Sequence, residues 1–420
     1  MTRRKWCRGS RQAVRVPVVW VVLAALTVTC GGTFADELAE KEVKTLGEVP
    51  GFGATEVAVS SDGQRLAYVA MRDEGQVVVC DGKDGPACDL VTGLTFSGNG
   101  RVLAYAACKG NQWCVVAGGK AGPAHTTVVG LGVSYNGKCV AYYVPDEGNT
   151  GTVYINGERR KGARAVASPA PVVSRTGVVA FAGRASGTFE MANPLSAKGG
   201  TRSGNWGYTD MLDRRIYMMC GRSRSRLYHD LRTPVFSPNG ATLAYAARLD
   251  TGWFILCGKD KLGGPFEDVS APVWSRDSRK VAFAARKGAE WHVVGGAKTE
   301  GPYDAVGVMA FSPRTRLLAC AVQKGGQWLL VCDGRKGPEC DDVHWIGFSE
   351  NDRHLACAVE SGGQWRMVVD GVEGPAHDRI HVPEEASQRD GVRYVAVDDG
   401  KACLMELAWP ADKDWQKGFE

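Results

Sequence analysis

The stretch FSPRTRLLACAVQKGGQWLLVCDGRKGPECDDV, residues 311–343, sets the fold that we predict for this 420-residue chain. One apolar run ends at Phe311, a second covers Leu317–Val322, and a third begins at Trp328. Ser, Pro, Gly and Asp residues separate the runs, and short apolar runs divided in this way are typical of antiparallel strands joined by hairpins. One such unit cannot bury its apolar faces alone, so the stretch predicts a series of similar units.

The same unit recurs along the chain, and its copies align on one serine. Successive serines lie 37 to 40 residues apart, except for a gap of 63 residues after the fourth. Most copies continue with a polar turn and a run similar to Leu-Ala-Tyr, and five carry a tryptophan sixteen residues after the serine. We expect that tryptophan to pack between units, because packing between units needs large buried side chains. The eight serines are Ser60, Ser97, Ser134, Ser174, Ser237, Ser275, Ser312 and Ser349.

A unit of about 40 residues with four short strands, repeated this often, predicts an all-β β-propeller. The eight units at 57–382 favour eight four-stranded blades, although seven or nine blades also fit the spacing. The fourth unit contains a long insertion at about 186–212, and residues 383–420 are interpreted as a partial repeat with a closing hairpin and a tail. Residues 36–56 form a lead-in, in which Val43–Val49 could supply a strand that closes the ring.

The first 35 residues differ from the rest of the chain. Six basic residues and no acidic ones precede a 15-residue apolar run, Val16–Cys30, and small residues follow it up to Ala35. This order is typical of a secretory signal peptide, and the apolar run is short for a membrane span. We therefore expect export to the periplasm or the extracellular space, with a retained N-terminal membrane anchor as the alternative.

Export changes the charge balance of the chain. The whole sequence has 51 basic and 46 acidic residues, but without the six basic residues of the signal the balance is 45 against 46. A mature chain close to neutrality gives no electrostatic support for binding nucleic acid.

The turns resemble those of a known family. Ser60-Ser61-Asp62-Gly63 and Ser237-Pro238-Asn239-Gly240, each followed by Leu-Ala-Tyr, resemble the "SPDG" repeat of bacterial TolB-like and WD-like propellers. The resemblance covers nearly all of the predicted mature chain. It implies an exported binding or scaffolding protein, or a gating domain attached to a serine hydrolase. The sequence has no Gly-x-Ser-x-Gly motif and no downstream segment long enough for a hydrolase domain.

The 14 cysteines are unusual for a chain of this kind. Two fall in the signal, and three pairs of the remainder bracket hairpin turns, where a disulfide could join them in an oxidising compartment. The alternative is that most of the cysteines are small buried apolar residues. The three predicted pairs are Cys80 with Cys88, Cys108 with Cys114, and Cys332 with Cys340.

Candidate ligand-binding residues lie where one unit passes to the next, because such connections line the mouth of a propeller's central channel. His344 and Trp345 occupy one such connection, and His381 occupies a similar place. The acidic residues Asp89, Asp304, Asp341 and Asp378 recur at one repeat position, which favours a local turn hydrogen bond over chemistry. The cysteine spacing does not fit a zinc site, and no nucleotide-binding or metalloprotease motif is present, so we expect neither metal nor cofactor.

These observations favour an exported binding or scaffolding module for a protein, peptide or glycan of the cell envelope. They predict contact with a membrane only if the N-terminal segment is retained. The alternative is a propeller enzyme of the lyase or glycosidase type, with its site at the channel mouth. No catalytic residues are identified from the sequence, because converging carboxylates cannot be recognised in it.

Overall fold

A computed structural model describes residues 38, 40–48, 56–146, 150–160, 164–165, 170–184, 215–295, 299–383, 386–410 and 415. Glu37–Glu420 form one compact unit. The predicted signal peptide at 1–35 and the predicted insertion at 186–212 lie outside the described residues. In the described part of the chain, no helix has the length and apolarity needed to cross a membrane.

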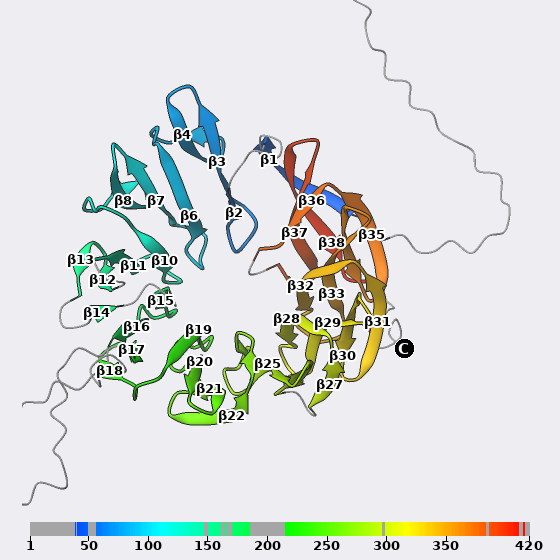
Figure 1. The fold of residues 1–420 in the computed structure, drawn as a ribbon. Helices are drawn as coiled ribbons and strands as arrows, with labels where there is room; N and C mark the ends of the chain where they lie inside the picture. The colour runs from blue at the N-terminus through cyan, green and yellow to red at the C-terminus, as the bar shows by residue number, and fades with distance from the viewer. Residues whose placement is uncertain are drawn as a thin grey trace, which may run out of the picture. The chain divides into compact units, whose positions relative to one another are not determined.

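The first five blades follow one another along the chain, each with its first strand on the inner side of the ring (Figure 1). Blade 1 contains β2 (Val57–Val59), β3 (Leu66–Arg72), β4 (Gly75–Cys80) and β5 (Lys83–Asp84). Blade 2 contains β6 (Leu90–Phe96), β7 (Leu103–Lys109), β8 (Gln112–Ala117) and β9 (Lys120–Ala121). Blade 3 contains β10 (Val129–Val133), β11 (Val140–Pro145), β12 (Gly151–Ile155) and β13 (Glu158–Arg159). Blade 4 contains β15 (Val172–Val173), β16 (Val179–Arg184), β17 (Ile216–Cys220) and β18 (Ser223–Arg224), and blade 5 contains β19 (Asp230–Phe236), β20 (Leu243–Leu249), β21 (Gly252–Cys257) and β22 (Asp260–Phe266).

The remaining blades complete the ring. Blade 6 contains β23 (Asp268–Val269), β24 (Val273–Trp274), β25 (Val281–Lys287), β26 (Glu290–Val294) and β27 (Glu300–Tyr303). Blade 7 contains β28 (Ala305–Phe311), β29 (Leu318–Lys324), β30 (Gln327–Cys332) and β31 (Arg335–Cys340). Blade 8 contains β32 (Asp342–Phe348), β33 (Leu355–Ser361), β34 (Gln364–Val369) and β35 (Val372–His377). Blade 9 contains β36 (Arg379–His381), β37 (Gly391–Asp398), β38 (Lys401–Ala408) and β1 (Glu40–Glu48).

The described residues form nine blades, so the preferred prediction of eight was wrong and the alternative of nine blades is the one observed. Blade 9 takes three strands from the C-terminal end and its outer strand, β1, from the N-terminal end, where Glu40 pairs with Leu407. The hairpin that the sequence predicts as a partial ninth unit is therefore the middle of a whole blade. Blade 9 in turn packs on blade 1, since Val395 and Leu404 share an apolar cluster with Val77 and Val79.

The repeat serine builds the turn between the first and second strands of its blade. Ser60 is fully buried, and its hydroxyl donates to Asp62 (2.6 Å) and accepts from the Arg65 amide (2.9 Å). Gly63 has a φ of +71°, a conformation that favours glycine. All eight repeat serines are buried, so this turn is a constant part of the scaffold.

The chain hydrogen-bonds to both blades where it passes from one to the next. Between blades 3 and 4, Ala165 of β14 (Arg164–Ala165) pairs with Gly151 of β12 and with Gly183 of β16. This link joins the two blades into one nine-stranded sheet. The same crossing recurs elsewhere, as where the Asp341 amide donates to the carbonyl of Glu360 in the following blade.

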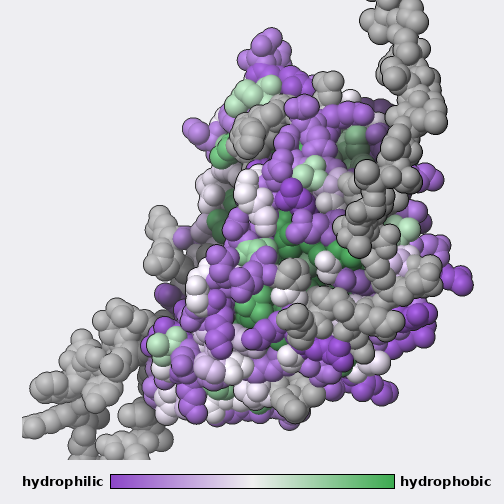
Figure 2. All heavy atoms as spheres, turned by 90° about the vertical axis from the view of Figure 1, so that its right-hand side faces the viewer, coloured by the Kyte–Doolittle hydropathy of each residue, from purple (hydrophilic) through white to green (hydrophobic). Residues whose placement is uncertain are grey.

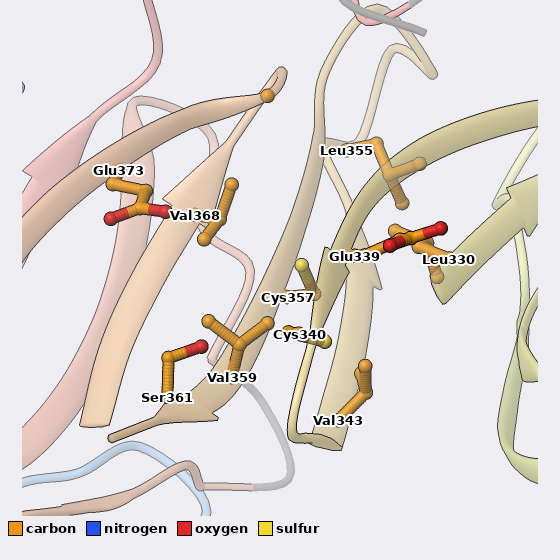
Figure 3. Close-up of a pocket in the computed structure, with 11 residues that line it drawn as sticks. Leu330, Glu339, Cys340, Val343, Leu355, Cys357, Val359, Ser361, Val368 and Glu373 are labelled. Carbon is orange, nitrogen blue, oxygen red and sulfur yellow. The ribbon is translucent and has the colours of Figure 1, made fainter. Parts of the chain in front are cut away.

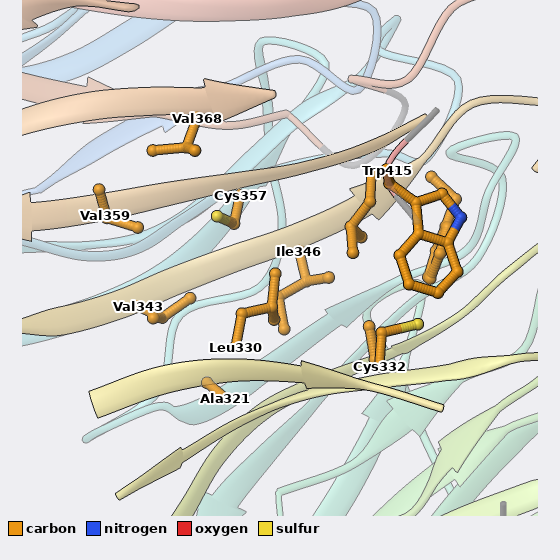
Figure 4. Packing of buried hydrophobic residues seen from close by; sticks show 12 residues of the cluster. Ala321, Leu330, Cys332, Val343, Ile346, Cys357, Val359, Val368 and Trp415 are labelled. Atoms are coloured by element: carbon orange, nitrogen blue, oxygen red, sulfur yellow. The ribbon is translucent and has the colours of Figure 1, made fainter. Parts of the chain in front are cut away.

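The apolar core lies between blades. Figure 4 shows the largest cluster, in which Leu330 and Cys332 of blade 7 meet Ile346 and Cys357 of blade 8, with Trp415 of the C-terminal tail against them. Repeat tryptophans contribute to these interfaces, as predicted, and Trp253 is only 3% exposed in the core between blades 5 and 6. On the side of the molecule seen in Figure 2, hydrophilic residues dominate and apolar ones are set between them.

Candidate binding site at the centre of the ring

The residue that follows each repeat serine differs widely between blades, from glycine and proline to tyrosine, arginine and glutamate. In most blades the turn's hydrogen bonds use the serine hydroxyl, the side chain two residues later and nearby backbone, so the residue between them can change without loss of the turn. In a repeat protein, specificity is placed at positions that vary on a constant scaffold. In blade order these residues are Ser61, Gly98, Tyr135, Arg175, Pro238, Arg276, Pro313 and Glu350.

Four of these variable residues line a cavity at the centre of the ring. Its volume is about 510 Å³, within the range of ligand sites. The innermost strands β6, β10, β15 and β19 of blades 2 to 5, which lie side by side in Figure 1, supply most of the wall. Apolar and polar groups share the wall about equally, and its apolar side chains include Phe96, Val133, Val173 and Phe236.

Arg175 supplies the positive charge of this cavity. Its guanidinium carbon lies 3.7 Å from the centre of the Tyr135 ring, which orients the exposed arginine side chain by a cation–π contact. Arg175 forms no ion pair with any described residue, whereas Arg276 reaches Glu350 at 4.0 Å and Arg316 reaches Asp277 at 2.7 Å. A partner carboxylate or phosphate could therefore bind Arg175 without displacing an internal acid.

Hydrogen bonds between neighbouring turns fix the part of the cavity rim that blades 2 and 3 supply. The Ser61 hydroxyl donates to the carbonyl of Gly98 (2.7 Å), and the Asn99 amide donates to the carbonyl of Tyr135 (2.8 Å). The rim of blades 1 to 3 is thus linked turn to turn. Such a rim is preorganised, which reduces the entropy lost when a ligand binds.

The predicted ligand residues lie elsewhere, on the first strands of blades 8 and 9. His344 Nε2 lies 3.4 Å from Glu360 and 3.6 Å from Asp342, and its ring stacks on Trp365 at 4.2 Å. Trp345 packs in the core between blades 8 and 9. His381 is partly buried, and burial together with Arg379 lowers its pKa. The structure gives these three residues different surroundings, and their role in ligand binding stays a prediction.

A repeat equivalent explains the stacking of His344. Arg232 occupies the same position in blade 5, where its guanidinium carbon lies 4.1 Å from the centre of the Trp253 ring. A side chain that covers the repeat tryptophan is therefore a packing device shared by at least two blades. Within the described residues, no group of three or more His, Cys, Asp or Glu side chains could hold a metal ion.

The recurrent aspartates form turn hydrogen bonds, but to the next blade rather than to their own turn. Asp89 accepts from the Gly110 amide (2.7 Å), Asp304 from that of Gly325 (2.7 Å) and Asp341 from that of Gly362 (2.8 Å). Each carboxylate caps the turn between the second and third strands of the following blade. Because these aspartates lie at equivalent turns of different blades, they do not converge on one point as a catalytic acid group would.

Strand register separates the predicted disulfide partners, and all the cysteines of the described residues are free thiols. Cys332 pairs with Arg335 and Cys340 pairs with Trp328, so the two cysteines lie at opposite ends of a hairpin. Four residues at about 3.3 Å each separate them by roughly 13 Å, too far for a disulfide. Cys80 and Cys88 are separated in the same way.

The Cys108–Cys114 pair fails for a second reason. Cys108 pairs with Trp113 and Cys114 pairs with Ala107. Adjacent residues of a strand point to opposite faces of the sheet, so these two thiols face different blades.

Sequence reasoning missed a buried cluster where the ring closes. His377, at the end of β35, lies 3.1 Å from Glu40 of β1 and 2.7 Å from Asp398 of blade 9. Glu40 also accepts a hydrogen bond from the Tyr394 hydroxyl. Burial alone would lower the pKa of His377, but the hydrogen bonds and charges of Glu40 and Asp398 raise it. Because Glu40 and His377 are 337 positions apart, no local signal connects them.

These features define the chain as a β-propeller with a partly apolar cavity at its centre. No family model and no curated protein matches the sequence. Among solved structures it is similar to the Dos1 propeller, at 11% identity over 81% of this chain and 96% of that one, with a TM-score of 0.43. It is also similar to the Cps50 (Swd1) β-propeller domain of Myceliophteria thermophila, at 13% identity over 88% and 100% of the two chains, with a TM-score of 0.38. TolB from Acinetobacter baumannii matches at 11% identity over 84% of this chain and 65% of that one, with a TM-score of 0.29.

Proposed function

We propose that this chain is an exported β-propeller of the TolB-like type that binds a protein, peptide or glycan of the cell envelope. The basic and apolar N-terminal segment supports export, and the Ser-x-Asp-Gly turns support the relationship. The nearly neutral charge of the mature chain favours such partners over nucleic acid.

The partner binds at the central cavity of blades 2 to 5 and presents a carboxylate beside an apolar side chain. The single observation that carries this proposal is Arg175, which is exposed in the wall of this partly apolar cavity and forms no ion pair with any described residue. Its guanidinium can bind a carboxylate through two parallel hydrogen bonds. Phe96, Tyr135 and Phe236 offer the apolar and aromatic contacts that dominate binding energy in interfaces.

The test is affinity capture from the envelope fraction with the mature protein and two arginine variants. Arg101→Ala is the matched control, because Arg101 is exposed in the corresponding turn of blade 2 and does not line the cavity. We expect one stoichiometric partner with the wild type and with Arg101→Ala. With Arg175→Ala, affinity should fall at least about tenfold, equivalent to about 1.4 kcal/mol. Equal capture by both variants would refute this site.

A further inference from the structure

A narrow pocket between blades 7 and 8 has two thiols in its wall. Cys340 is the last residue of β31, and Cys357 lies in β33 of the next blade. Both line the pocket together with Val343, Val359 and Leu330. Figure 3 shows the two cysteine side chains next to each other, with Val343 and Val359 beside them. The cavity volume is about 20 Å³, room for about one water molecule.

The pocket exists because blade 8 lacks an aromatic side chain at this place. Most blades have a buried tyrosine or phenylalanine where Cys357 stands. Between blades 1 and 2, for example, Cys88 occupies the position of Cys340 but meets Tyr105. Exchange of the aromatic ring for a thiol lets two cysteines of neighbouring blades share one cavity. The aromatic residues at the equivalent position are Tyr68, Tyr105, Tyr142, Phe181, Tyr245 and Phe283.

We propose that Cys340 and Cys357 form a disulfide that joins blades 7 and 8 when the protein meets a disulfide oxidant. Such oxidants are oxidised glutathione and the thiol–disulfide oxidoreductases. This modification site does not depend on the partner proposed for the central cavity.

The pocket's geometry sets the order of the two steps. Polar residues, Glu339, Ser361 and Glu373, lie in the wall with the thiols, and Cys340 is the more accessible thiol. The Cys340 thiolate attacks a sulfur of the oxidant, which forms a mixed disulfide and releases one reduced thiol. Cys357 then gives its proton to water and attacks the Cys340 sulfur, which releases the second thiol. Two protein thiols lose two electrons and two protons, and the oxidant's disulfide is reduced to two thiols.

The reaction should be faster at alkaline pH. Burial raises the pKa of Cys340 to about 11, with the nearby Asp342 and Asp341 adding to the effect. Burial raises the pKa of Cys357 to about 12, with Cys340 as the second cause. The thiolate is the attacking species. As long as the pH stays below these pKa values, each rise of one pH unit increases the thiolate fraction about tenfold.

The experiment is oxidation of the folded mature protein by oxidised glutathione at pH 7 and pH 9. Remaining thiols are then alkylated in denaturant, and cross-linked peptides are mapped by mass spectrometry without reduction. We expect a Cys340–Cys357 peptide and a loss of two thiols per chain, reached faster at pH 9. Recovery of both cysteines as alkylated thiols, or of Cys340 linked to another cysteine, would overturn the proposal.

Matched serine variants keep the test specific. Cys332→Ser removes a thiol from the same apolar cluster and should leave the cross-link intact. Cys340→Ser and Cys357→Ser should each abolish it, and their thermal unfolding in the reduced state shows whether they fold. If either of these two variants fails to fold, peptide mapping of the wild type and Cys332→Ser alone shows whether the Cys340–Cys357 cross-link forms.

Discussion

Replacement of His377 by glutamine tests how the two chain ends hold the ring closed. In the wild type, the His377 side chain is 6% exposed and lies between Glu40, which is 7% exposed, and Asp398. Removal of one partner from a buried ion pair leaves the other charge uncompensated, which costs about 3–5 kcal/mol. We therefore expect His377→Gln to lower the free energy of unfolding by about this amount at pH 6.

The loss should depend on pH in a defined direction. The pKa of His377 is raised in the folded protein because the bonds to Glu40 and Asp398 outweigh the effect of burial. A histidine whose pKa is raised by folding stabilises the folded protein. This stabilisation is fully present below the ordinary histidine pKa, about 6.5, and is lost as the pH rises through the pKa of the folded state. The difference in unfolding free energy between wild type and His377→Gln should thus be larger at pH 6 than at pH 9.

Urea unfolding at the two pH values measures this difference. His229→Gln is the control, since His229 also bonds an aspartate, at 2.6 Å, but the side chains of that pair are 39% and 83% exposed. An exposed pair contributes about 0–1 kcal/mol, so the control should unfold nearly as the wild type does. A His377→Gln effect that is equal at both pH values, or larger at pH 9, would refute the reasoning.

Three further substitutions test other parts of the ring. Trp415→Ala should cost about 3–5 kcal/mol in urea unfolding, because the indole is 1% exposed in the core shared by blades 7 and 8, and an unchanged midpoint would contradict this. Glu300→Gln should raise the melting temperature at pH 8 more than at pH 5. Burial and Asp333 raise the pKa of Glu300, so its stabilising protonated form is lost as pH rises, and a gain confined to pH 5 would contradict this. Asp304→Ala should speed amide exchange at Gly325 while Gly362, capped by Asp341, exchanges as before; equal rates at Gly325 would exclude the cap.

The fold was largely predictable because its signals repeat. Ser312 and Trp328 have counterparts at fixed offsets in other units. Ser312 builds a turn within its own unit, and Trp328 packs in the core shared with the next unit. Blade 9 was not predictable in the same way, since it has no repeat serine and takes β1 from the other end of the chain. The hairpin disulfides failed because a bracket around a turn does not fix strand register, as Cys332 and Cys340 show.

The candidate site was predictable only in part. Tyr135 and Arg175 follow repeat serines, so the variable turn position could have identified them from the sequence. The sequence does not show that the two residues line one cavity, because this depends on how blades 2 to 5 pack around the centre of the ring. The His377 cluster depends on ring closure, which brings together residues from opposite ends of the chain.

Site-specific photo-cross-linking tests the central claim, that the partner binds at the cavity of blades 2 to 5. A photoreactive residue placed at Pro238, in the cavity wall, should form a covalent adduct with the captured partner. The same residue at Met71, which is 70% exposed at the opposite end of β3 from the serine turn, should form none. An adduct from Met71 with none from Pro238 would contradict the account.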